Sequence, residues 1–104
     1  MKIFDIAGMQ AYDYNQREKN VFHKAAGYKM RVIHLGPDGA MPECAMASHV
    51  IFVCIAGEAI VTVDGDTTAV SPGQCLVTGP AVVSMKTSGG AQLLGIQISA
   101  GDPL

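Results

Sequence analysis

Short apolar and β-branched runs, separated by glycine, proline and other turn residues, fill most of the chain after Val21. No long stretch repeats apolar residues at the i, i+3, i+4, i+7 spacing of an amphipathic helix. This pattern predicts an all-β domain. The expected strands cover residues 21–25, 28–35, 49–56, 58–64, 67–70, 74–78, 81–87 and 91–98.

The clearest turn signal is Asp64-Gly65, which lies between two alternating runs. Asp-Gly readily adopts the positive φ angles of a type I′ turn, so we expect a β-hairpin here. The runs 49–56 and 91–98 are apolar at both odd and even positions. Such strands are typical of a barrel or a two-sheet sandwich whose outer face is also covered. A second copy of the chain would cover that face, and we therefore expect a homodimer.

The two ends of the chain carry weaker patterns. The opening run MKIFDI predicts an edge strand, paired either within its own subunit or with a second copy. Residues 10–20 are polar and predict at most a turn or two of helix. The tail SAGDPL is short and polar, and we expect it to be loosely held.

The 104 residues, of which 49% are apolar and 15% charged, predict one core-rich domain spanning residues 1–104. A net charge of -2 without any run of Lys or Arg argues against nucleic-acid binding. Asp5 interrupts the chain too early for a signal-peptide core, and no apolar run is long enough to cross a membrane. We therefore expect a cytoplasmic protein without a membrane partner.

The three cysteines lack C-x-x-C spacing, and their odd number argues against a disulfide framework. Free cysteine behaves as a small apolar residue. We expect Cys54 and Cys75 to lie in the core.

The segment GAMPECAMASHVIFVCIAGEAIVTVDGDTTAVSPGQCLVTGPAVVSMKT resembles the two conserved motifs of the small single-domain cupins. Gly39 opens the first motif, at about 39–57, and Gly57 closes it; Pro72-Gly73 begins the second, at about 73–86. The resemblance covers residues 35–86. It implies a cupin-type β-barrel, also described as a double-stranded β-helix or jelly roll, that is usually a homodimer with its site in the barrel mouth.

In this family three histidines and one glutamate hold Fe, Mn, Ni or Zn. Counting back from Gly57, the family glutamate falls on Val50. The two histidines of the first motif fall on Glu43 and Ala45 with four intervening residues, or on Cys44 and Met46 with three. The last histidine falls on Met85 or on Ser84, depending on the anchor. Because these ions prefer imidazole and carboxylate donors, we expect no standard metal site and no tightly bound metal cofactor.

A rearranged metal site is the alternative, and His49 is its main candidate. On a regular strand Val50 and Phe52 face inward and His49 faces outward. A β-bulge near residues 47–48 would turn His49 inward, where it would hold a divalent transition metal with Glu43 or Cys44.

Glu43 and Cys44 also have possible roles without metal. A carboxylate in an apolar barrel mouth has a raised pKa and serves as a general acid or base. A thiol beside His49 or Lys86 is activated as a nucleophile. A solvated carboxylate and an unreactive packed thiol are the simpler interpretations.

The sequence thus predicts a small cupin-type barrel that binds a small organic ligand in an apolar cavity, lined in part by adaptable methionines. The expected cavity residues are Glu43, Ala45, His49, Val50, Phe52 and Met85. The alternative is a metal-dependent oxygenase or isomerase with Glu43 and His49 in its ligand shell. A third possibility is a sensor whose dimer binds a partner protein.

Overall fold

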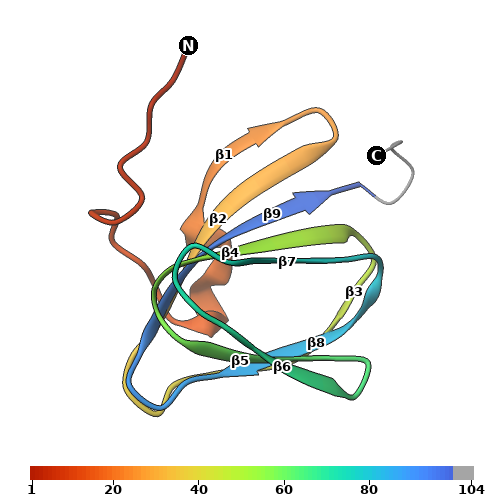
Figure 1. Cartoon of the computed structure of the whole chain (residues 1–104). Coiled ribbons are helices and arrows are strands. Elements are labelled where there is room, and N and C mark those ends of the chain that lie inside the picture. The colour runs from red at the N-terminus through yellow and green to blue at the C-terminus, as the bar shows by residue number, and fades with distance from the viewer. Residues whose placement is uncertain (100–104) are drawn as a thin grey trace.

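The computed structural model describes residues 1–99, and within them it contains one short 3₁₀ helix and nine strands (Figure 1). The expectation for the tail therefore falls almost wholly outside the described residues. The elements are η1 (Tyr14–Asn20), β1 (Val21–Ala25), β2 (Tyr28–Leu35), β3 (Ala40–Met46), β4 (His49–Gly57), β5 (Ala59–Val63), β6 (Asp66–Val70), β7 (Cys75–Thr78), β8 (Ala81–Lys86) and β9 (Ala91–Ile98).

The strands form two antiparallel sheets that face each other (Figure 1). One sheet has the order β1-β2-β9-β4-β7 and the other has the order β3-β8-β5-β6. The all-β prediction is confirmed. No hydrogen-bonded strand pair joins the two sheets among the described strands, so they form a sandwich and not a closed barrel.

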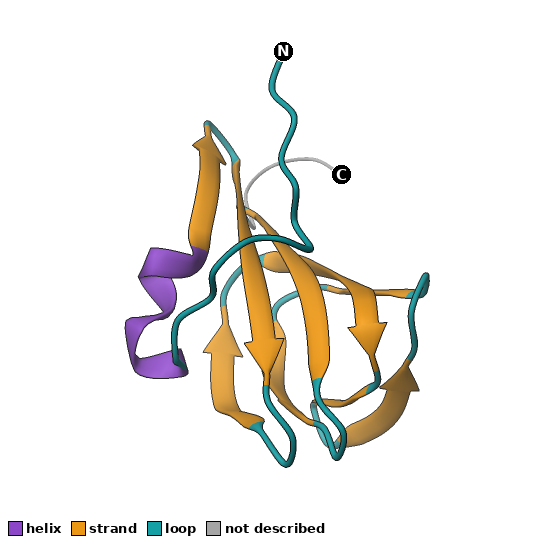
Figure 2. Cartoon of the chain, turned by 90° about the vertical axis from the view of Figure 1, so that its left-hand side faces the viewer, coloured by secondary structure: helices purple, strands orange, loops and turns teal. Residues whose placement is uncertain are grey.

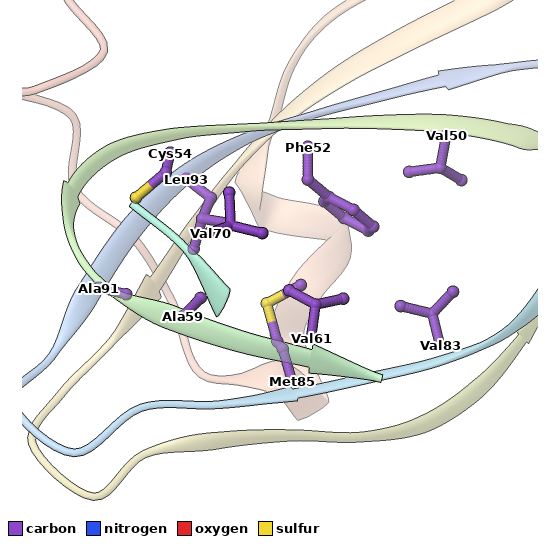
Figure 3. Close-up of a cluster of buried hydrophobic side chains, with 10 residues drawn as sticks. All are labelled: Val50, Phe52, Cys54, Ala59, Val61, Val70, Val83, Met85, Ala91 and Leu93. Atoms are coloured by element: carbon purple, nitrogen blue, oxygen red, sulfur yellow. The ribbon is translucent and has the colours of Figure 1, made fainter. Parts of the chain in front are cut away.

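The core lies between the two inner faces. Val50, Phe52 and Cys54 alternate along β4 and are buried, as the period of two along a strand requires. Figure 3 shows Phe52 pointing from β4 toward Val61 and Met85 on the opposite sheet, and Val50 pointing toward Val83. The predicted inward face of this strand is therefore confirmed.

The predicted hairpin at Asp64-Gly65 is also confirmed. The two residues have φ angles of 47° and 88°, in the left-handed region that a type I′ turn requires. Val63 and Asp66 are paired directly on either side of the turn, so β5 and β6 are joined by a loop of only these two residues.

β3 was not among the predicted strands, and it contains a β-bulge. Met41 pairs with Met85, whereas Cys44 pairs with Val83, so β3 has one more residue than β8 between these pairs. Pro42 and Glu43 occupy the bulge; proline lacks the N–H that a regular ladder would use there. The extra residue brings Met41, Cys44 and Met46 onto one half-buried face.

Two expectations need correction. The opening run MKIFDI forms no strand within its own subunit, and pairing with a second copy stays a prediction. It crosses the outside of the five-stranded sheet (Figure 2), where Gln92 Nε2 donates a hydrogen bond to the Ile6 carbonyl at 3.0 Å. The expected burial of Cys75 is wrong. Cys75 is exposed. It pairs with Val53 on β4, and alternation along β7 turns Leu76 toward the core and Cys75 outward. Cys54 is buried as predicted.

Candidate functional site

A pocket of about 400 Å³ lies between η1, β3 and the inner face of the five-stranded sheet. Its lining residues come from β2, β3, β4 and β9 together with the segment from Tyr12 to Asn20. η1 lies beside the strands (Figure 2), and Tyr14, Arg17, Glu18 and Asn20 of η1 line one side of the pocket.

The floor of the pocket is a row of residues across three strands. Arg31 on β2 pairs with Gly95 on β9, which pairs in turn with Phe52 on β4. A Cβ atom at Gly95 would lie 3.4 Å from Arg31 Cγ, 3.4 Å from Ile33 Cδ1 and 3.7 Å from Phe52 Cε1. A side chain at Gly95 would therefore contact all three residues, and the glycine keeps this part of the pocket lining without one.

The wall formed by η1 is held by Asn20, which is buried. Its Oδ1 accepts a hydrogen bond from the backbone N–H of Tyr12 at 2.7 Å, and its Nδ2 donates to the Tyr12 carbonyl at 3.0 Å. These two bonds tie the end of η1 to the chain that precedes it.

Tyr14 is the first residue of η1 and borders the pocket. The guanidinium carbon of Arg17 lies 4.3 Å from the centre of the Tyr14 ring, which is cation–π geometry. Burial raises the pKa of the Tyr14 hydroxyl, and a hydrogen bond with Cys44 raises it further. Tyr14 is therefore neutral at pH 7, a hydroxyl close to the Cys44 thiol on β3.

Arg31 is the best-buried charged group of the site, with a side chain 14% exposed. Its Nη2 donates a hydrogen bond to Gln97 Oε1 at 2.8 Å and lies 3.6 Å from Glu18 Oε1. Its Nε is buried and has no hydrogen-bond partner among the described residues. Lys29 lies one row farther along the same face of β2, and its Nζ is 4.0 Å from Glu18 Oε2.

Comparison with known proteins gives structural matches. No protein-family model and no curated protein matches the chain. A Klebsiella pneumoniae protein described as having a double-stranded β-helix domain superposes with a TM-score of 0.82 at 16% identity, covering 99% of this chain and 94% of that one. An RmlC-like cupin from Desulfovibrio desulfuricans superposes with a TM-score of 0.78 at 13% identity, covering 94% and 96%. A Desulfitobacterium hafniense cupin superfamily protein gives 0.70 at 14%, covering 76% and 73%.

The chain has the cupin fold. The resemblance that its glycines and turns carry is confirmed at the level of the fold, as is the expected double-stranded β-helix. No helix of the described chain is long and apolar enough to span a membrane.

The pocket includes two of the expected cavity residues, Val50 and Phe52. Met85 is buried in the core beside them and does not line the pocket. His49 is half-buried at the start of β4, and a Cβ atom at Gly79 would lie 3.7 Å from its ring. It too stays outside the pocket lining, and the bulge of this region lies in β3 and not at residues 47–48.

Glu43 and Ala45 are exposed on β3 and do not line the pocket. The bulge is the physical reason, because the residues of β3 that border the pocket are Ala40 and Met41 before it and Cys44 and Met46 after it. The structure thus follows the shorter of the two spacings considered for the first cupin motif.

On this spacing, the residues that the cupin resemblance assigns to the metal positions are Cys44, Met46 and Val50, with either Met85 or Ser84 as the fourth. This set contains no imidazole and no carboxylate, so it does not reproduce the shell of three histidines and one glutamate that holds the metal in this fold. Within residues 1–99, no three His, Cys, Asp or Glu side chains gather in a group that could hold a metal ion.

Sequence reasoning missed Tyr14, Asn20, Arg31 and Gly95, all outside the cupin motifs. Two signals in the sequence could have indicated Arg31 and Gly95. Lys29 and Arg31 share an alternating face with the apolar Ile33 and Leu35, and a charge on an apolar strand face calls for a partner. A glycine inside the apolar run 91–98 indicates close approach of another group.

Proposed function

We propose that this cupin binds a small organic molecule in the pocket between η1 and the five-stranded sheet, without a transition metal. The observation that supports this most directly is the row of Arg31, Gly95 and Phe52 in the pocket lining, in which a glycine places no side chain between a cation and an aromatic ring.

The size and chemistry of the pocket agree with this proposal. A volume of about 400 Å³ falls within the range of roughly 300–1,000 Å³ that is typical of small-molecule sites. Phe52, Ile33 and Met41 supply apolar surface, and the polar groups gather toward η1. An apolar site with a few convergent polar groups both buries a ligand and fixes its orientation.

The absence of a metal from the proposal rests on donor chemistry. Cys44 and Met46 stand where a cupin enzyme has imidazoles, and Val50 stands where it has a carboxylate. A neutral thiol and a thioether are poor donors for Fe, Mn and Ni, and these two sulfur atoms are fewer than the three or four protein ligands of a zinc site.

A filled-pocket variant tests the proposal. Gly95→Leu places a side chain in the space between Arg31, Ile33 and Phe52, whereas Gly89→Leu makes the same change where nothing lies within 4 Å of the new Cβ atom. Fragments of up to about twenty non-hydrogen atoms are screened by ligand-observed NMR against both variants and the original chain.

We expect a subset of fragments to bind the original chain and Gly89→Leu, and to lose binding to Gly95→Leu. Gly95→Ala keeps the test usable if the larger change impairs folding, because its Cβ atom makes contacts of 3.4 Å or longer. Binding that is equal in all variants, or no binding by any fragment, contradicts the proposal.

A further inference from the structure

The guanidinium of Arg31 lacks a close anionic partner. Its shortest contact, at 2.8 Å, is to the neutral amide oxygen of Gln97, and Nε makes no hydrogen bond among the described residues. Removing a charge from water without pairing it carries a substantial free-energy cost. Arg31 therefore has unused capacity to bind an anion at the wall of the pocket.

Glu18 is the carboxylate nearest to this cation, and its contacts are long. Its oxygens lie 3.6 Å from Arg31 Nη2 and 4.0 Å from Lys29 Nζ, and its side chain is 75% exposed. Exposed pairs of this kind contribute little stability, since water screens them and both side chains lose rotamer freedom. The position of Glu18 thus shows where Arg31 and Lys29 attract a carboxylate. Glu18 itself is bound there only weakly.

The charges around the pocket favour an anion. Its charged lining residues are the cations Arg17, Lys29 and Arg31 and the anions Asp13 and Glu18. The local balance is positive, although the whole chain has a net charge of -2. The amide of Asn20 is occupied by Tyr12, and the guanidinium of Arg17 lies over the Tyr14 ring and donates to the Tyr14 carbonyl. Arg31 and Lys29 are therefore the cations best placed to orient a charged ligand.

We propose that the ligand is a small carboxylic acid with an apolar body. Its carboxylate displaces Glu18 and binds the guanidinium of Arg31, with Lys29 beside it, and its apolar part lies over Gly95 against Phe52. A carboxylate matches the planar fork of a guanidinium and pairs with it at two points. Two nearby cations and an apolar floor suit a monoanion better than a phosphate dianion.

This inference rests on the proposed function and adds the class of ligand. The probes are phenylacetate, its neutral isostere phenylacetamide, and phenyl phosphate, titrated into ¹⁵N-labelled protein and followed by NMR. The Nε–H resonance of Arg31, assigned with Arg31→Lys, reports contact with the guanidinium.

We expect phenylacetate to bind at least tenfold more tightly than phenylacetamide and to shift the Arg31 Nε–H resonance. Arg31→Gln removes the preference for the acid, whereas Lys24→Gln, which removes the same charge from an exposed residue of β1 outside the pocket, keeps it. Glu18→Gln tightens phenylacetate binding several-fold because its competitor is gone.

Equal binding of the acid and the amide overturns the carboxylate assignment and leaves the proposed function standing. Tighter binding of phenyl phosphate than of phenylacetate also overturns it. If no probe binds and the fragment screen gives no hit that depends on Gly95, the proposed function fails as well.

Discussion

The side chain of Asn20 hydrogen-bonds to both backbone groups of Tyr12, at 2.7 Å and 3.0 Å, across a separation of eight residues. The Asn20 amide both accepts from and donates to the backbone of Tyr12, as a residue of a neighbouring strand does in an antiparallel sheet. It closes the segment that carries Tyr14 and Glu18, and so fixes the outer wall of the pocket.

Asn20→Ala should lower the free energy of unfolding by about 1–3 kcal/mol, because it leaves the backbone groups of Tyr12 without these partners. Chemical denaturation measures this loss. Asn15→Ala, an exposed change within the same helix, is the control and should alter stability by no more than about 0.5 kcal/mol. Equal losses in the two variants would show that the Asn20 bonds contribute nothing specific.

Gly57→Ala should destabilise the protein by more than about 3 kcal/mol. The new Cβ atom would lie 2.0 Å from the Gly90 carbonyl oxygen, and the φ of +72° is unfavourable for alanine. Gly73→Ala is the matched control, since its φ is +85° but nothing lies within 4 Å, so it should cost only about 1 kcal/mol. A loss at Gly57 no larger than that at Gly73 would contradict the close approach of the two loops.

The β-bulge of β3 makes opposite predictions for two neighbouring positions. Met46→Glu turns a carboxylate toward the half-buried inner face and should cost roughly 2 kcal/mol or more, whereas Ala45→Glu adds one to the exposed face and should change stability by about 0.5 kcal/mol at most. Thermal or chemical unfolding of both variants distinguishes them. The reverse order would mean that β3 is regular and that Glu43 and Ala45 face inward.

The three thiols should react in a fixed order with a maleimide, followed by mass spectrometry. Cys75 is exposed and reacts first, half-buried Cys44 follows, and Cys54 reacts only on unfolding. Early labelling of Cys54 would contradict this packing.

Burial raises the pKa of Cys54 above its ordinary value of 9.0. Above that pH the thiol ionises first in the unfolded chain. The stability contributed by the buried neutral thiol is therefore present below about pH 9 and lost as the pH rises.

The expected homodimer remains a prediction, and the outer face of the five-stranded sheet supplies its test. Ile96, Ile51 and Val77 form an apolar row across this face, with Val77 64% exposed. We expect a dimeric mass by light scattering, shifted to the monomer by Val77→Lys. Val82→Lys, at a residue 42% exposed on the other sheet, should remain dimeric. A monomeric original chain would refute the expectation.

Sequence reasoning succeeded where local chemistry determines structure. Asp64-Gly65 fixed its hairpin because only a few residue pairs accept two positive φ angles. The alternation of Val50, Phe52 and Cys54 set the inward face of β4 in the same way. The glycines and turns of the cupin motifs led to the correct fold.

It failed where the pairing of distant strands decides the outcome. The bulge at Pro42 breaks the alternation of β3, so neither that strand nor its inward residues followed from a period of two. Arg31 and Gln97 are 66 residues apart, and their contact depends on the register of β2 against β9. Cys75 is apolar by type but lies on the outer side of an edge strand, which composition alone does not reveal.

Gly95, which has no side chain, also makes the depth of the pocket adjustable by a single substitution. Each atom added there would reduce the depth of the pocket while η1 stays in place. If the proposed function holds, a graded series of glycine, alanine, serine and valine at this position would measure how the length of a bound molecule depends on that depth.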